Sequence, residues 1–174
     1  MKKIIFKTIK AIVIIEIVCL CVYTILHETG HAIMTLLMGG EIKQISLFPQ
    51  AFVKGSLPIP EKPMARIFIG LAGIVFPFII AIIINFIKTK RFKTWLFNLS
   101  LKFISLVNFI SSIVILFMYQ IGHVIEKDDI VQVAKHNPEG IVFYYTLLAV
   151  LSIITMIDIA KMKPVSRVLD YYEN

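Results

Sequence analysis

The chain has 174 residues, of which 58% are hydrophobic, and its mean hydropathy is +0.86. This composition excludes a soluble globular domain and indicates a protein that crosses the lipid bilayer several times. The formal net charge is +7. Because the basic residues flank the apolar runs, we attribute this charge to lipid headgroups and topology and expect no nucleic acid partner.

Four apolar runs are each long enough to cross a membrane, since about 20 helical residues span the hydrocarbon core. They cover residues 11–38, 64–87, 95–121 and 141–160. We therefore expect an all-α polytopic membrane protein with four transmembrane helices, folded as a single transmembrane domain over residues 1–174. Gly70, Ala72 and Gly73 give the second run a face of small residues, which favours close helix packing.

The stretch after the first run does not follow a helical pattern. Residues 41–48 alternate loosely between polar and apolar side chains, and residues 51–54 follow after Pro49-Gln50. Two short runs separated by turn residues are typical of a β-hairpin. We predict a small membrane-associated hairpin over residues 41–54 that rests against the helices, because an isolated hairpin is only marginally stable.

The first apolar run contains the pattern His-Glu-x-x-His at His27, Glu28 and His31. Residues four apart share one face of a helix, so the two imidazoles can bind one metal ion. Glu28 lies beside them as a candidate general base. The alternative is a pair of buried histidines satisfied by neighbouring polar groups. We favour the metal site because ionisable side chains at hydrocarbon depth are costly unless they serve a function.

A catalytic zinc ion usually has three protein ligands, so one more must come from elsewhere in the chain. We predict Asp128 or Asp129, because both begin a short helical segment and a carboxylate there can point back into the bundle. Asp is also a favoured N-cap residue, so the pair can instead serve only to cap the helix over Ile130–His136. The remaining candidates are Glu16, His123, Glu126 and Asp158.

Further polar side chains lie inside the apolar runs. Glu16, Tyr23 and His27 share one stripe of the first helix, because seven and eleven residues are close to two and three turns. Glu16 can either line a water path to the metal or hydrogen-bond to another helix. Asn108 lies near the middle of the third run, where an amide is costly unless it is hydrogen-bonded.

Taken together, these pieces resemble the site-2 protease family of intramembrane zinc metallopeptidases. The resemblance is carried by His27-Glu28-Thr29-Gly30-His31-Ala32, Gly39-Gly40-Glu41-Ile42-Lys43, Leu71-Ala72-Gly73-Ile74-Val75-Phe76-Pro77, and Asn108 followed by an aspartate pair. It implies one zinc ion per chain, held by His27, His31 and Asp128, with Glu28 as the base and Asn108 holding the substrate backbone. The family often has Asp-Gly and Asn-x-x-Pro where this chain has Asp128-Asp129 and Asn108-Phe109-Ile110-Ser111.

The resemblance also implies a function and a location. We expect an integral protein of a prokaryotic cell membrane that hydrolyses peptide bonds of membrane-embedded or membrane-proximal protein substrates. Three other functions stay open: an inactive metalloprotease-like protein that binds membrane segments, a small transporter, and a purely structural membrane subunit, which would leave the polar groups unexplained. An intact Glu28 argues against the first, and the second would use a polar line of Glu16, His27, His31 and Asp158.

Basic residues are unevenly divided between the two sides that four spans imply. Eleven lie on the side of the termini and six on the opposite side, so the positive-inside rule predicts that both termini are cytoplasmic. This places His27 and His31 in the half of the first span nearer the outside, whereas the resemblance alone favours the cytoplasmic half. The eleven are Lys2, Lys3, Lys7, Lys10, Lys88, Lys90, Arg91, Lys93, Lys161, Lys163 and Arg167, and the six are Lys43, Lys54, Lys62, Arg66, Lys127 and Lys135.

Overall fold

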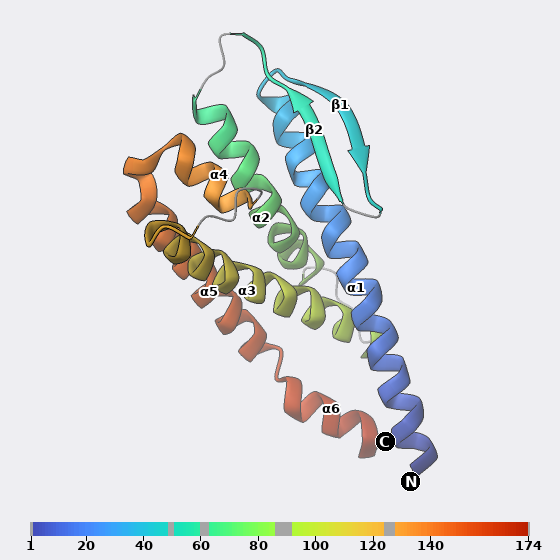
Figure 1. Cartoon of the computed structure of the whole chain (residues 1–174). Coiled ribbons are helices and arrows are strands. Elements are labelled where there is room, and N and C mark those ends of the chain that lie inside the picture. The colour runs from blue at the N-terminus through green and yellow to red at the C-terminus, as the bar shows by residue number, and fades with distance from the viewer. Residues whose placement is uncertain (1, 49–50, 60–62, 86–91, 124–127, 174) are drawn as a thin grey trace.

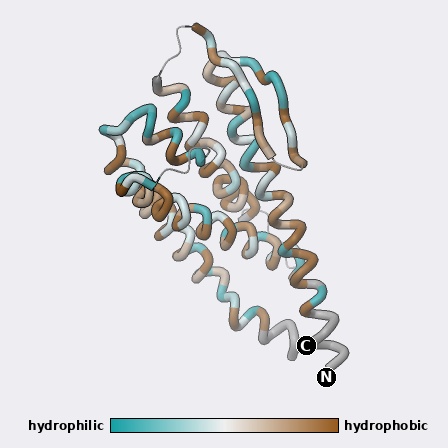
Figure 2. The backbone as a smooth tube through the Cα atoms, in the orientation of Figure 1, coloured by the Kyte–Doolittle hydropathy of each residue, from teal (hydrophilic) through white to brown (hydrophobic). Residues whose placement is uncertain are grey.

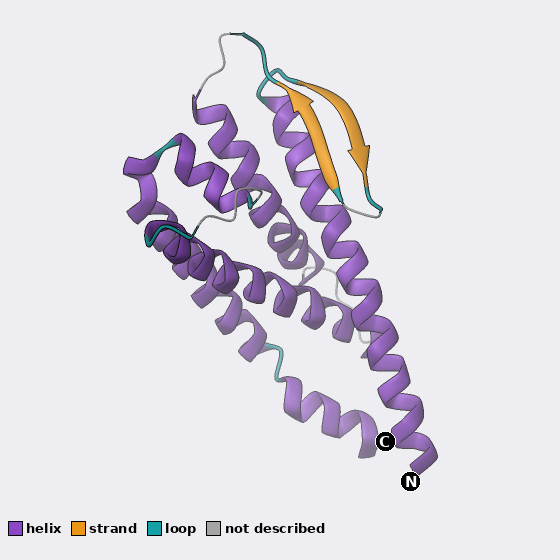
Figure 3. Cartoon of the chain, viewed as in Figure 1, coloured by secondary structure: helices purple, strands orange, loops and turns teal. Residues whose placement is uncertain are grey.

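The computed structural model describes residues 2–48, 51–59, 63–85, 92–123 and 128–173, which form a helical bundle with one small β-hairpin (Figure 1, Figure 3). The elements in chain order are α1 (Lys2–Leu37), β1 (Glu41–Ser46), β2 (Phe52–Ser56), α2 (Pro63–Asn85), α3 (Phe92–Gln120), α4 (Asp129–His136), the 3-10 turn η1 (Pro138–Gly140), α5 (Ile141–Lys161) and α6 (Pro164–Glu173).

Four helices are long and apolar enough to cross a membrane, at Ile12–Leu37, Met64–Ile84, Phe92–Gln120 and Pro138–Lys161. The prediction of an all-α polytopic membrane protein is confirmed. The predicted end of the second span, residues 86–87, lies outside the described residues. Both termini lie at one end of the bundle and the hairpin lies at the other (Figure 1). Hydrophobic residues run along the spanning helices, whereas hydrophilic ones gather on the hairpin and α4 (Figure 2).

The hairpin directly follows the helix that carries the His-Glu-x-x-His pattern. β1 pairs with β2 in antiparallel fashion from Glu41 opposite Ser56 to Ser46 opposite Phe52. The second strand therefore ends two residues later than predicted, and the predicted turn at Pro49-Gln50 lies outside the described residues. The hairpin rests on α1 at Thr35, where a Cβ atom on Gly55 of β2 would lie 2.7 Å from the Thr35 Cγ2 atom.

α4 is short and amphipathic, and it packs back into the bundle. The chain reverses after α3 at Gly122, whose φ of +90° favours glycine. Asp128 then caps α4 by accepting a hydrogen bond from the Ile130 N–H at 3.0 Å. The apolar side chains of α4 are fully buried, and burial of an Ile or Val side chain contributes roughly 1.5–3 kcal/mol relative to exposure to water. These contacts fix the start of α4 close to α2.

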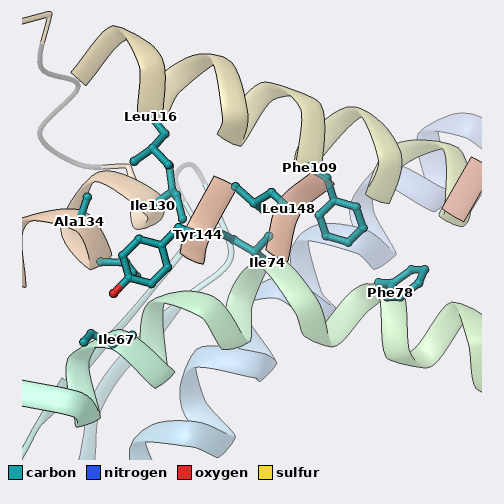
Figure 4. Packing of buried hydrophobic residues seen from close by; sticks show 10 residues of the cluster. Ile67, Ile74, Phe78, Phe109, Leu116, Ile130, Ala134, Tyr144 and Leu148 are labelled. Atoms are coloured by element: carbon teal, nitrogen blue, oxygen red, sulfur yellow. The ribbon is translucent and has the colours of Figure 1, made fainter. Parts of the chain in front are cut away.

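The main core is shared by α2, α3, α4 and α5 (Figure 4). Aliphatic side chains of α4 meet aromatic and aliphatic ones of the three long helices there. The cluster consists of Ile67, Ile74, Phe78, Phe109, Leu116, Ile130, Val133, Ala134, Tyr144 and Leu148. α1 lies outside this cluster and packs on α2 through small residues instead.

Small residues bring α1, α2 and α4 close together, as the sequence predicted for the second span. A Cβ atom on Gly30 of α1 would lie 2.5 Å from the Ala72 carbonyl oxygen of α2. A Cβ atom on Gly70 would lie 2.5 Å from the Val133 side chain of α4. Backbones can approach this closely only where no side chain intervenes. α2 therefore lies against the metal-motif face of α1 on one side and against α4 on the other.

Candidate metal centre

Three side chains from two elements converge on one point between α1 and α4. The Asp129 Oδ2 atom lies 2.9 Å from His27 Nε2 and 3.1 Å from His31 Nε2. The two Nε2 atoms lie 3.1 Å apart. Among the described residues, these three form a group of donor atoms that can hold one metal ion. The helical spacing brings the two histidines together, and the return of α4 into the bundle brings Asp129 to them.

The His31 ring is oriented by α2. Its Nδ1 atom lies 2.8 Å from the Ile69 carbonyl oxygen, which can only accept, so Nδ1–H is the donor, and in the neutral ring Nε2 presents a lone pair. The flat face of the ring lies against Gly73, where any Cβ atom would overlap the ring atoms Cε1 and Nε2. A ligating histidine is usually fixed in this way by a carbonyl acceptor on its other nitrogen.

The donor set fits zinc. In a neutral His31 ring, the Nε2 lone pair lies beside the Asp129 carboxylate oxygen and the His27 Nε2 atom. Three electron-rich atoms can lie this close favourably only if protons or a cation lie among them. Two imidazoles and one carboxylate are ligands that zinc commonly takes. Bonds of about 2.0–2.1 Å in a tetrahedral site would put the donors about 3.3 Å apart, close to the separations seen here.

The structure brings Asp129, the sequence-based alternative, to the histidines, and it places Asp128 at the N-cap of α4. Asp128 thus does what the capping interpretation expected, and burial raises the pKa of its carboxyl above the ordinary value. Burial would also raise the pKa of Asp129, but hydrogen bonds with His27 and His31 outweigh it and hold that pKa well below the ordinary value. A low pKa keeps the Asp129 carboxyl ionised, as a metal ligand must be.

Glu28 lies in the wall of a cavity of about 560 Å³ that also contains the three converging side chains. It is 8% exposed, and its carboxylate interacts with the backbone N–H of Val53 on β2. β2 thus forms part of the cavity wall together with α1, α2 and α4. The Ile69 carbonyl and the backbone of β2 are parts of the site that side-chain patterns do not reveal.

Asn108 does not line this cavity. It lies on α3 and accepts a hydrogen bond from Ser112 at 3.4 Å. The buried Tyr23 hydroxyl faces Asn108 without a well-formed hydrogen bond. Tyr23 in turn lies next to His27, with 6.3 Å between ring centroids. A role for Asn108 in holding substrate stays a prediction. The structure places Asn108 beside Tyr23, which in turn lies next to His27.

The other carboxylates considered as ligands have different partners. Glu16 accepts a hydrogen bond of 2.6 Å from Ser100 of α3, which is the helix–helix contact that the sequence left open. Asp158 of α5 forms an ion pair of 2.7 Å with Lys102 of α3. Glu126 lies outside the described residues, and His123 is exposed at the end of α3. Asp158 is therefore paired with Lys102 and not with the histidines, so Glu16, His27, His31 and Asp158 do not form a continuous polar line.

Four spanning helices and a His/His/Asp cluster define a membrane protein with a candidate metal centre. The sequence profile of the Peptidase M50B-like family matches residues 7–162. The chain therefore belongs to the Peptidase M50B-like family, which is the site-2 protease family, and the resemblance that the motifs indicated is confirmed. No curated protein and no solved structure matches the chain.

Proposed function

We propose that this protein is an intramembrane zinc metalloprotease that hydrolyses peptide bonds of membrane-embedded or membrane-proximal proteins. The observation that carries the proposal is the meeting of His27, His31 and Asp129 in one cavity with Glu28. Membership of the Peptidase M50B-like family supports it. One zinc ion per chain, with Asp129 as the third ligand in place of Asp128, accounts for the convergence of three acceptor atoms.

Each residue has a distinct task in the proposed reaction. When bound, zinc supplies a Lewis acid that polarises the scissile carbonyl and a water molecule that is acidic enough to react near neutral pH. The Glu28 carboxylate would accept a proton from the attacking water and return it to the nitrogen of the leaving amine. The Ile69 carbonyl holds the His31 ring, and the buried face of α4 holds Asp129.

The hairpin suits a substrate that must unfold before it is cleaved. A membrane helix hides its carbonyls in hydrogen bonds, so a scissile bond becomes accessible only when the helix unwinds locally. β2 lies beside the cavity through residues 52–56, and an unwound segment can add to such an edge as a further strand. This pairing would hold the substrate backbone without reading its sequence.

We also infer an integral protein of a prokaryotic cell membrane with both termini in the cytoplasm, from the four spans and the distribution of basic residues. Two alternatives compete with proteolysis. An inactive metalloprotease-like binding protein has no use for an intact Glu28. A transporter that uses Glu16, His27, His31 and Asp158 conflicts with the ion pair between Asp158 and Lys102.

The test separates metal binding from hydrolysis. Glu28→Ala and Glu28→Gln should each retain one zinc ion per purified chain and lose cleavage of co-expressed single-span reporter proteins by at least about 100-fold. Thr29→Ala is the matched control, because Thr29 is next to Glu28 but bonds the Ile25 carbonyl and does not line the cavity. A zinc-loaded wild type that cleaves no reporter would favour the binding protein, and a wild type that holds no stoichiometric zinc would favour the transporter.

A further inference from the structure

The cavity extends beyond the metal centre to a second group of polar side chains that the proposed reaction does not use. Arg66 of α2 and Gln132 and His136 of α4 line the same cavity as His27, Glu28, His31 and Asp129. Arg66 and His136 are exposed, whereas Glu28 and His31 are buried. The cavity thus has a buried metal end and an exposed basic end.

Helix geometry explains why these groups lie together. Asp129, Gln132 and His136 are three and seven residues apart, so they share one face of α4. Gly70 of α2 touches Val133, and Arg66 lies one turn before Gly70 on the same face of α2. The close approach of α2 and α4 therefore brings the Arg66 guanidinium and the outer turn of α4 to the same end of the cavity.

The charges of the cavity wall are separated. Among the described lining residues, the two carboxylates, Glu28 and Asp129, both lie at the metal end, where the two positive charges of a zinc ion would balance them. Of the lining residues that the structure describes, Arg66 is the one arginine, and none is a lysine. Arg66 has a further interaction within the chain, but its guanidinium offers five N–H donors. With zinc bound, the outer end of the cavity is therefore positive and rich in donors.

We propose that this outer end selects substrates that carry an acidic side chain close to the scissile bond, with Arg66 as the main specificity residue and Gln132 and His136 as secondary contacts. The inference rests on the proposed function. Arg66 lies about 10 Å along α2 from Gly73, which touches the His31 ring, and His136 lies about 10 Å along α4 from Asp129. An extended peptide advances about 3.3 Å per residue, so the acidic residue is about three positions from the cleaved bond.

Short peptide hydroxamates test this without requiring turnover. The hydroxamate chelates zinc in place of the scissile bond, and binding to the zinc-loaded protein in detergent is followed by fluorescence polarisation. Two series are needed, with the hydroxamate at the N-terminal or the C-terminal end, so that both sides of the cleaved bond are sampled. Each series carries Glu, Gln or Lys at the second or third position.

In one series the Glu peptide should bind roughly tenfold tighter than the Lys peptide, with Gln between them. Arg66→Gln should flatten this order and Arg66→Glu should reverse it. Lys135→Glu is the matched control, because Lys135 is exposed on α4 beside His136 but does not line the cavity, and it should preserve the order.

Two results would overturn the inference. Equal binding of Glu and Lys peptides in both series would exclude a basic subsite while leaving the metal centre intact. The same order in Arg66→Glu as in the wild type would remove Arg66 from the assignment. If no hydroxamate binds the zinc-loaded protein, the metal has no open position for a substrate, so the proposed function fails and the subsite fails with it.

Discussion

Asp128 and Asp129 are neighbours with different tasks because α4 begins between them. The N-cap residue has extended backbone, here with φ −80° and ψ 137°, and its carboxylate turns back to the Ile130 N–H. Asp129 is the first helical residue, and its side chain leaves the helix toward α1. A shift of one helical residue turns a side chain by about 100°, so only one of the pair can meet both histidines.

The first prediction separates the two aspartates. Asp129→Ala should lose stoichiometric zinc, because two imidazoles alone hold it poorly, while Asp128→Ala should keep zinc and lose about 1 kcal/mol of stability with its cap. Asp128→Asn preserves a capping side chain and serves as the control. Zinc per chain from elemental analysis and thermal unfolding report the two effects. Zinc lost only in Asp128→Ala would transfer the ligand role to Asp128, and zinc retained in both would exclude the carboxylate pair.

A second prediction concerns Gly73, which supports the metal centre without touching the ion. In Gly73→Ala the new methyl group overlaps the His31 ring, so the ring must turn away from the Ile69 carbonyl. Loss of such an orienting contact typically weakens metal affinity by about 10–100-fold. Competition with a fluorescent chelator measures this change. Ile79→Ala, on an exposed part of the same helix, should bind zinc like the wild type. Wild-type affinity in Gly73→Ala would contradict the proposed support.

At the scale of elements, the features that could be predicted are those that depend on residues close together in the sequence. The spans, the hairpin and the pairing of His27 with His31 are local patterns, and they can be read from consecutive residues. The hydrogen bond between Glu16 and Ser100 and the ion pair between Lys102 and Asp158 join residues far apart in the sequence. Periodicity tells which residues need a partner at hydrocarbon depth, but helix packing decides which partner they meet.

The ion pair between Lys102 and Asp158 links two spanning helices, α3 and α5. The Lys102 side chain is fully buried, its Nζ atom lies 2.7 Å from the Asp158 carboxylate, and it also donates to the Met162 sulfur at 3.3 Å. A buried charge without its partner is very costly, whereas replacement of both partners by apolar groups is often tolerated. The pair therefore specifies how α3 and α5 meet.

A third prediction follows from this asymmetry. Lys102→Ala should destabilise the protein by about 3 kcal/mol, because it leaves the Asp158 carboxylate without its cation. The double variant Lys102→Met with Asp158→Leu should be closer to the wild type, since neither charge remains. Unfolding of the purified protein in mixed micelles with increasing sodium dodecyl sulfate compares the three. If the double variant loses as much stability as Lys102→Ala, packing rather than charge accounts for the effect.

At the scale of the whole molecule, the metal centre lies in the half of the bundle away from the termini. His27 and His31 occupy the second half of α1, and the hairpin that follows lies at the end opposite both termini (Figure 1). The exposed end of the cavity, at Arg66 and His136, belongs to the same half. The compartment that contains the termini therefore determines the side from which a substrate reaches the site.

The last prediction is the orientation itself. Eleven basic residues on the side of the termini against six on the hairpin side favour cytoplasmic termini. The dense basic run from Lys88 to Lys93 separates the second and third spans by few residues in the sequence, which is where the rule works best. A fluorescent reporter fused after Asn174 should be bright, and alkaline phosphatase fused there should be inactive. Phosphatase fused after Gly140, before α5, is the control and should be active. Active phosphatase with no fluorescence after Asn174 would invert the topology, and the cavity would then open toward the cytoplasm, as the family resemblance alone favours.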